Sequence, residues 1–178
     1  MFQKKLREMM EAKAYVSIYK NRDDLSLFAF GLIVACNEEH FMLASFDPHG
    51  ENDGLQLGET DTICKMEYHD SYARRMEKLI HYYKTKYEEY HFQDDLILGL
   101  LEYSKANAFI VSIELCNSGH FEAIGLVNSF YKEGCRILLI DQYGNEDGYA
   151  EIKYSDISQI NSNEYDERYR RILHQMST

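Results

Sequence analysis

An internal repeat is the feature that most constrains the fold. The stretch "FDPHGENDG" (46–54) returns 94 residues later as "IDQYGNEDG" (140–148), and both copies read D-x-x-G-x-x-D-G after an apolar run. At the same offset Gly31 falls on Gly125, and the 36 positions from 31 to 66 contain 8 identities. Self-similarity at a fixed offset indicates that one structural unit has been duplicated. We therefore expect a chain built twice.

The flanking segments extend the repeat. The stretch "EAKAYVSI" (11–18) matches "KANAFIVSI" (105–113) with one residue inserted. Beyond the shared core, an apolar stripe with 4-3-4 spacing recurs at an offset of 93. Its members are Tyr72, Met76, Leu79 and Tyr83 in the first copy, and Tyr165, Tyr169, Ile172 and Met176 in the second. These matches predict domains at 1–84 and 96–178, with 85–95 as a linker that continues a long helix.

Each copy has the same predicted elements. A short helix (3–12; about 95–106) precedes five short strands separated by turn residues, and a further helix closes the unit. This order predicts a mainly β fold with α-helices: two tandem small antiparallel five-stranded barrels, joined by the long helix and closed by a C-terminal helix. Alternation in the first strands places Val16 and Ile18, and likewise Val111 and Ile113, inside.

The repeated loop has the composition of a turn. A calcium loop requires D-x-[DN]-x-[DN]-G followed by a distant Glu, and His49 and Tyr143 break that pattern. Gly and Asp both tolerate positive φ, so Asp-Gly is a strong hairpin signal. We therefore expect a structural hairpin with its Asp-Gly pair at the tip.

The element order resembles the Sm-like (LSm) family. The residues that carry the resemblance are V-S-I in the first strand, G-L in a bent second strand and D-I-x-x-I in the last. Proteins of that family form rings that bind RNA, so the resemblance implies a small barrel and an RNA ligand. Two departures weaken the second implication. His40 and Gly134 stand where the family has an Asn, and Glu59-Thr60 and Lys153-Tyr154 stand where it has Arg-Gly.

Composition narrows the classes of function. The net charge of −11 disfavours unspecific nucleic-acid binding, and no apolar run is long enough for a signal peptide or a bilayer span. The four cysteines are scattered without C-x-x-C, which is typical of reduced thiols. We expect a cytoplasmic protein that binds neither DNA nor membranes.

Motifs for catalysis and metal binding are sparse. Glu88-x-x-His91 has the spacing of half a metal site but lacks a companion motif, and Glu77 with His81 is a common surface pair. The sequence contains no G-x-S-x-G, P-loop, G-x-G-x-x-G or H-E-x-x-H. We predict no enzyme activity, no cofactor and no metal.

The helix predicted at 70–90 combines the apolar stripe with a basic face. One interpretation is a structural strut with a solvated basic side; the other is a surface for RNA or an acidic partner. The candidate contact residues are Arg74, Arg75, Lys78, Lys86, Tyr82, Arg168, Arg170 and Arg171. We predict a non-enzymatic interaction module that binds protein partners or self-assembles through a remaining strand edge. The alternative is an Sm-like regulator that binds RNA through this helix.

Overall fold

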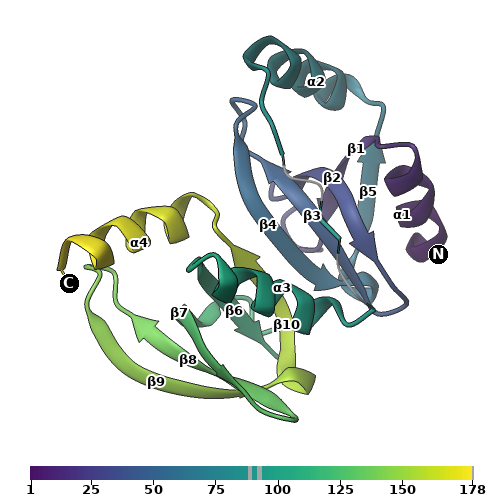
Figure 1. Ribbon diagram of the computed structural model, residues 1–178. Helices are drawn as coiled ribbons and strands as arrows, with labels where there is room; N and C mark the ends of the chain where they lie inside the picture. Colours follow the sequence, from purple (N-terminus) through teal and green to yellow (C-terminus); the bar gives the residue numbers. More distant parts are fainter. Residues whose placement is uncertain (88–89, 92–93, 178) are drawn as a thin grey trace. The chain divides into compact units, whose positions relative to one another are not determined.

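The computed structural model describes residues 1–87, 90–91 and 94–177 (Figure 1). The chain divides into two compact units, Met1–Leu96 and Ile97–Thr178. Within each unit the elements follow the same order: a helix, four strands, a short 3₁₀ turn, a fifth strand and a second helix. This shared order gives every element of one unit a counterpart in the other.

The first unit begins with α1 (Phe2–Glu11) and ends with α2 (Ser71–Tyr83). Its strands are β1 (Tyr15–Tyr19), β2 (Ala29–Cys36), β3 (His40–Phe46), β4 (Asn52–Glu59) and β5 (Lys65–Tyr68), with η1 (Thr60–Thr62) before β5. The second unit contains α3 (Leu96–Ala106), β6 (Ile110–Leu115), β7 (Phe121–Phe130), β8 (Gly134–Ile140), β9 (Glu146–Lys153), η2 (Tyr154–Asp156), β10 (Ile157–Ser162) and α4 (Tyr165–Ser177).

The sheets are antiparallel and open. The strand order is β5-β1-β2-β3-β4 in the first unit and β10-β6-β7-β8-β9 in the second. Among the described strands, no ladder joins β5 to β4 or β10 to β9. The mainly β fold with helices is confirmed, but the prediction of two closed barrels is wrong. An open sheet covered by helices on both faces has the same alternation and turn spacing as a barrel, so these patterns could not separate the two.

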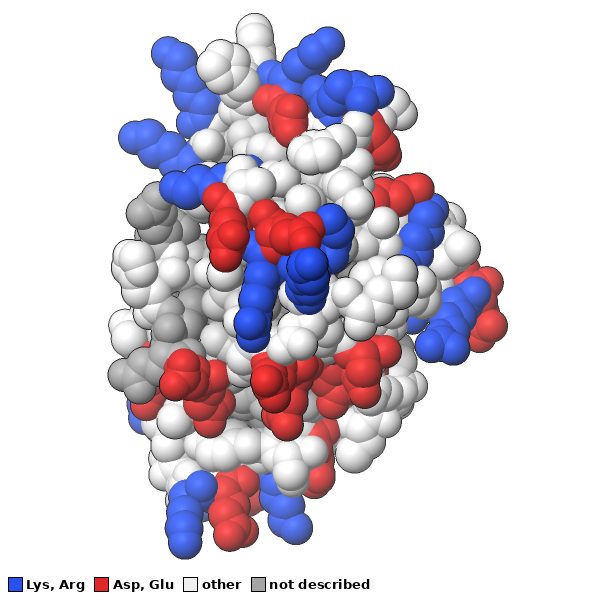
Figure 2. Space-filling model, turned by 90° about the vertical axis from the view of Figure 1, so that its right-hand side faces the viewer, with Lys and Arg blue, Asp and Glu red and all other residues white. Residues whose placement is uncertain are grey.

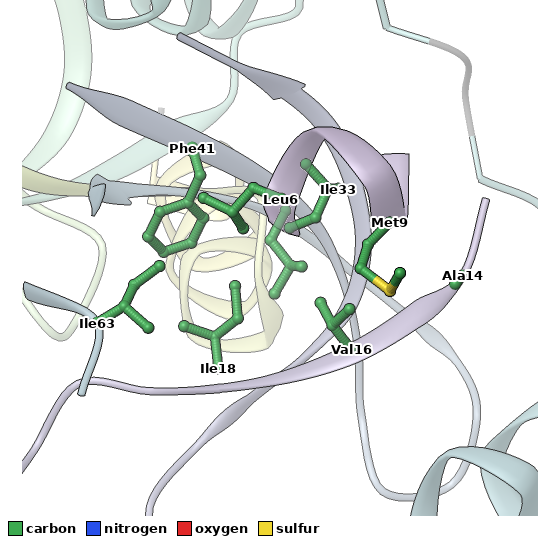
Figure 3. Packing of buried hydrophobic residues seen from close by; sticks show 9 residues of the cluster. Leu6, Met9, Ala14, Val16, Ile18, Ile33, Phe41 and Ile63 are labelled. Atoms are coloured by element: carbon green, nitrogen blue, oxygen red, sulfur yellow. The ribbon is translucent and has the colours of Figure 1, made fainter. Parts of the chain in front are cut away.

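The first unit has an apolar core on each face of its sheet. On one face, Leu6 and Met9 of α1 contact a cluster that includes Val16, Ile18 and Phe41 (Figure 3). On the other face α2 provides Ala73, Met76 and Ile80, which pack with Phe30, Leu32 and Phe46. The neighbours Leu32 and Ile33 belong to opposite clusters, as strand alternation requires. Burying each large side chain stabilises the fold by about 1.5–3 kcal/mol.

The first strands of the two units are equivalent residue by residue. Val16 pairs with Gly31, and Val111 pairs with Gly125. A Cβ at Gly31 would lie 2.0 Å from the carbonyl oxygen of Ala44, and one at Gly125 would lie 1.9 Å from that of Leu138. Only glycine fits beside such a close backbone. The predicted burial of Val16, Ile18, Val111 and Ile113 is confirmed, since each is at most 2% exposed.

The repeated loops are tight turns held by their first aspartate. The carboxylate of Asp47 accepts hydrogen bonds from the backbone N–H groups of His49 and Glu51, at 2.9 Å each. Asp141 accepts in the same way from Tyr143 and Asn145, at 2.8 Å each. The turn glycines, Gly50 and Gly144, both have φ of +88°.

The Asp-Gly pairs do not form the hairpin tips that we expected. Gly54 and Gly148 lie inside β4 and β9, with φ of +74° and +82°, next to irregularities in the strand register. One type of β-bulge places a Gly at positive φ, so the same dipeptide serves a bulge as well as a turn.

The helix predicted at 70–90 is shorter than expected. It ends at Tyr83 because Lys84 adopts the left-handed conformation (φ 53°), and the N–H of Thr85 bonds to the carbonyl of Ile80 at 3.0 Å. The Thr85 hydroxyl then donates to the carbonyl of Gly50 at 2.7 Å. The described part of the predicted linker is therefore not a continuation of the helix, and positions 88–89 lie outside the described residues.

Strand β9 lies at an edge of the second unit's sheet. Its pairing partner is β8, and it carries the acidic residues Glu146, Asp147 and Glu151. The register shifts between the pairs at Leu138 and Ile140, which places a bulge in the strand. Charges and bulges are features that prevent an edge strand from adding further strands.

Candidate interaction surfaces

Helix α2 presents a basic face to solvent. The Asp70 carboxylate caps the helix by accepting from the N–H of Ala73 at 2.9 Å, which fixes the side that packs on the sheet. The predicted contact residues Arg74, Arg75 and Lys78 of α2 are exposed, and so is Lys86, which lies beyond the end of the helix at Tyr83. Lys and Arg side chains gather at the top of Figure 2, the height at which α2 lies in Figure 1. The basic face predicted from sequence thus lies on the surface of the first unit.

The contacts that the basic residues of α2 make within the unit leave most of their positive charge accessible to a ligand. The Arg74 guanidinium donates to the carbonyl of His69 at 2.6 Å, and that of Arg75 lies 5.1 Å from the centre of the Tyr72 ring. Tyr82 is 77% exposed and forms an edge-to-face pair with Tyr83, with ring centres 5.1 Å apart. An exposed aromatic ring beside cations suits the stacking of a base as well as contact with a protein.

The three predicted arginines of α4 are held by their own unit. Arg168 donates to the carbonyl of Asn163 and Arg170 to that of Ile140, at 2.7 Å each. The Arg171 guanidinium lies 5.0 Å from the centre of the Phe109 ring. The two helices therefore differ in exposure: the arginines of α4 are half-buried against their unit, whereas Arg74, Arg75 and Lys78 of α2 are exposed, although Arg74 donates a bond like that of Arg168.

Helix α4 attaches to its sheet through polar groups. Glu167 is only 4% exposed, and its carboxylate accepts a hydrogen bond from the Ser112 hydroxyl of β6. The ring nitrogen Nδ1 of His174 lies 2.9 Å from the carbonyl oxygen of Gly144. With Arg170 these residues form the polar seat of α4: Glu167, Arg170 and His174. Their spacing of three and four residues places them on one side of the helix.

The opposite side of α4 is apolar and exposed. Tyr165, Tyr169, Ile172 and Met176 are 60%, 57%, 52% and 79% exposed, respectively. We call these four residues the α4 stripe. Tyr165 and Tyr169 contact each other with ring centres 5.3 Å apart. An amphipathic helix normally buries its apolar side, so a stripe that faces solvent while polar groups face the sheet is a candidate contact surface.

The offset of 93 between the two closing helices pairs the α4 stripe with the wrong residues of α2. The structure equates the two helices at an offset of 94: Arg74 bonds to the carbonyl of His69 as Arg168 does to that of Asn163. The buried residues of α2 then correspond to the polar seat of α4: Ala73 to Glu167, Met76 to Arg170 and Ile80 to His174. The offset of 93 was one residue short, a rotation of about 100°. Applying the offset of 94, which relates the repeated loops, to the helices would have predicted that the α4 stripe faces solvent.

The predicted stripe of α2 is itself only partly buried. Met76 is fully buried, Tyr72 and Leu79 are half-buried, and Tyr83 is 59% exposed. Burial raises the pKa of the Tyr72 hydroxyl, and Arg75 lowers it by a smaller amount. The residues that seat α2 follow the spacing of Ala73, Met76 and Ile80 instead.

The thiols and carboxylates offer little for catalysis. All four cysteines are free; Cys116 is exposed, whereas burial raises the pKa of Cys135 to about 11 and keeps it as a thiol at neutral pH. Within the described ranges, no group of three or more His, Cys, Asp or Glu side chains could hold a metal ion. Glu88 of the E-x-x-H motif lies outside those ranges.

The first unit contains one further hollow of interest. A pocket of about 280 Å³ is lined mainly by apolar side chains, among them Met10, Leu32, Ile33 and Tyr87, with Lys13 and His91 as polar members. This volume is just below the range of about 300–1,000 Å³ that is typical of ligand sites. Its described lining residues provide an apolar surface and no carboxylate.

No family model, curated protein or solved structure matches this chain. Of the helices that the structure describes, none is long and apolar enough to cross a membrane.

Proposed function

We propose that this chain is a non-enzymatic, cytoplasmic interaction module that binds a protein partner or another copy of itself through the α4 stripe. The observation that carries the proposal is the orientation of α4. Its polar residues Glu167, Arg170 and His174 contact the sheet, and its apolar residues face solvent. Tyr, Ile and Met at helical spacing are the side chains that helix-binding partners contact.

A photo-crosslinking residue at position 172 tests this function. Ile172 lies in the middle of the stripe, and Tyr131, which is 46% exposed in the turn between β7 and β8, supplies a matched position outside it. In cells that make the protein, we expect the probe at 172 to form one dominant crosslinked product and the probe at 131 to form none. Equal labelling from both positions, or no product from 172, would contradict the proposed function.

RNA binding through α2 is the second candidate. It is supported by the exposed cations Arg74, Arg75 and Lys78 beside Tyr82, on a chain that is otherwise acidic. A segregated basic surface with an aromatic ring is the minimum that single-stranded RNA requires. Electrophoretic mobility shifts with single-stranded RNA over a series of salt concentrations test this candidate.

We also propose that the two units descend from one Sm-like ancestor, with 1–84 and 96–178 as the copies and 85–95 between them. The shared element order supports this origin, and so do the equivalent pairs Val16–Gly31 and Val111–Gly125. A common origin implies a common backbone and leaves the ligand open, because function depends on the side chains of a site.

A further inference from the structure

We propose that the α4 stripe is the interface of a two-fold dimer, in which α4 packs antiparallel against α4 of a second copy. This inference rests on the proposed function and names the partner. It uses the stripe residues Tyr165, Tyr169, Ile172 and Met176, which are exposed in the single chain.

The spacing of the stripe fits a helix pair. Steps of four, three and four residues are those of the core positions of a coiled coil. In an antiparallel pair centred between positions 170 and 171, Tyr169 faces Ile172 of the second copy and Tyr165 faces Met176. Each contact joins an aromatic ring to an aliphatic or thioether side chain, and sulfur–aromatic contacts are favourable. The stripe is therefore complementary to itself in this direction.

Charge favours the antiparallel direction over the parallel one. Asp166 and Arg168 flank the stripe on opposite sides. In the antiparallel pair Asp166 approaches Leu173 of the second copy and Arg168 approaches its Gln175, so no like charges meet. A parallel pair would place the acidic first turns of both helices, with Glu164 and Asp166, side by side. It would also align the two helix dipoles in the same direction, whereas antiparallel dipoles attract.

The area of the stripe predicts a weak dimer. From the exposed fractions of its four side chains and the usual areas of such residues, the pair buries roughly 900 Å² in total. Specific interfaces begin at about 1,000 Å². We therefore expect a dissociation constant in the micromolar range, on the order of 10 µM, so that monomer and dimer coexist at ordinary concentrations.

Sedimentation equilibrium over a concentration series from about 1 µM to 500 µM tests the dimer. We expect the wild type to pass from monomer to dimer. The double variant Tyr169→Asp/Ile172→Asp should weaken association by at least about 30-fold, since hot-spot side chains contribute 2 kcal/mol or more. Tyr131→Asp is the matched control, because it places the same charge on an exposed tyrosine of the β7–β8 turn, outside the stripe. Circular dichroism checks that each variant is folded.

Crosslinking through introduced cysteines tests the direction of the pair. In a Cys116→Ser background, which removes the exposed thiol, a chain with Tyr165→Cys is mixed with a chain with Met176→Cys. The antiparallel pair predicts a disulfide between the two variants. It predicts none from Tyr165→Cys alone, because positions 165 of the two copies are then about 16 Å apart along the axis.

Three results would overturn the dimer: a monomer mass throughout the series, a dimer that the double Asp variant leaves intact, or a disulfide from Tyr165→Cys alone. The photo-crosslink at position 172 separates this failure from failure of the proposed function. A crosslink to a different protein, with a purely monomeric chain, refutes the dimer and retains the interaction module; absence of any crosslink refutes both.

Discussion

Helices α2 and α4 are counterparts that attach to their sheets in opposite ways. Helix α2 buries Ala73, Met76 and Ile80 among aromatic side chains, whereas the same positions of α4 are Glu167, Arg170 and His174. Both helices contact the turn before the fourth strand at Gly50 and Gly144. The same backbone arrangement is thus compatible with an apolar or a polar contact between helix and sheet. Where the three contact residues are polar, as in α4, the apolar side chains of the helix lie on the surface.

The sheet residues on the helix side also differ between the units: they are apolar in the first and more polar in the second. Met42, Leu55 and Leu57 are at most 1% exposed. Their counterparts by strand register are Arg136, Tyr149 and Glu151, and Arg136 forms an ion pair with Glu151 whose N–O distance is 2.7 Å. The second unit therefore carries polar and aromatic groups where the first carries apolar ones.

Exchanging the equivalent residues should have the largest effect. Met76→Arg places an unpaired charge in the core under α2, and we expect a loss of at least about 4 kcal/mol in unfolding free energy. The reciprocal Arg170→Met removes one hydrogen bond from a half-buried site and should change stability by only about 1 kcal/mol. Urea denaturation measures both. Equal losses of unfolding free energy would mean that the two helices contact their sheets through interfaces of the same kind.

The turn glycines give the next largest effect. A Cβ at Gly144 would lie 2.5 Å from the backbone of Leu173 and His174, whereas Gly148 has nothing within 4 Å; both have positive φ. Gly144→Ala should therefore cost about 3 kcal/mol or more, through strain and displacement of α4. Gly148→Ala should cost only the strain, about 1 kcal/mol. Thermal denaturation compares them, and a smaller loss at Gly144 would contradict the close contact.

The aspartate of the second turn should make stability depend on pH. Backbone hydrogen bonds from Asn145 are the main cause that lowers the pKa of Asp141 below its usual value. A depressed folded pKa contributes stability that is present above the unfolded pKa, about 3.9, and is lost as pH falls through the folded pKa. The difference between wild type and Asp141→Asn should thus be constant above about pH 5 and shrink below pH 4. A difference that grows with acidity would disprove this role.

The smallest effect on stability should come from the basic face of α2. Because Arg74, Arg75 and Lys78 are exposed, changing all three to Glu should alter stability by less than about 0.5 kcal/mol each. The same change at Arg168, Arg170 and Arg171 should destabilise the fold more, since these side chains are half-buried in contact with their unit. If α2 binds RNA, its triple change should also abolish binding and remove about two units from the log–log salt slope. Unchanged RNA affinity would exclude this surface.

Local sequence patterns predicted some features and could not predict others. Alternation identified Val16 and Ile18 as buried, because the side to which a strand residue points depends on its neighbours along the chain. The end of α2 depends on Lys84, which carries no helix-stop signal in its residue type. Whether the last strand meets the fourth depends on tilt and stagger, which no short pattern encodes.

The candidate surfaces show the same division. The exposed cations of α2 followed from their helical spacing, whereas the outward stripe of α4 did not. Spacing alone defines a stripe but not the side that faces the sheet. That side is decided by Ser112 and Gly144, which are distant in sequence from Glu167 and His174.

The acidic edge strand β9 has a consequence for the behaviour of concentrated solutions. Its outer edge is flanked by the acidic residues Glu146, Asp147 and Glu151, whose charge opposes the addition of a further strand. Near the isoelectric point of about 5.0 the chain also loses the net repulsion that keeps molecules apart. We therefore expect concentrated solutions to aggregate most readily near pH 5.0, with β9 as an edge that is available for pairing between molecules.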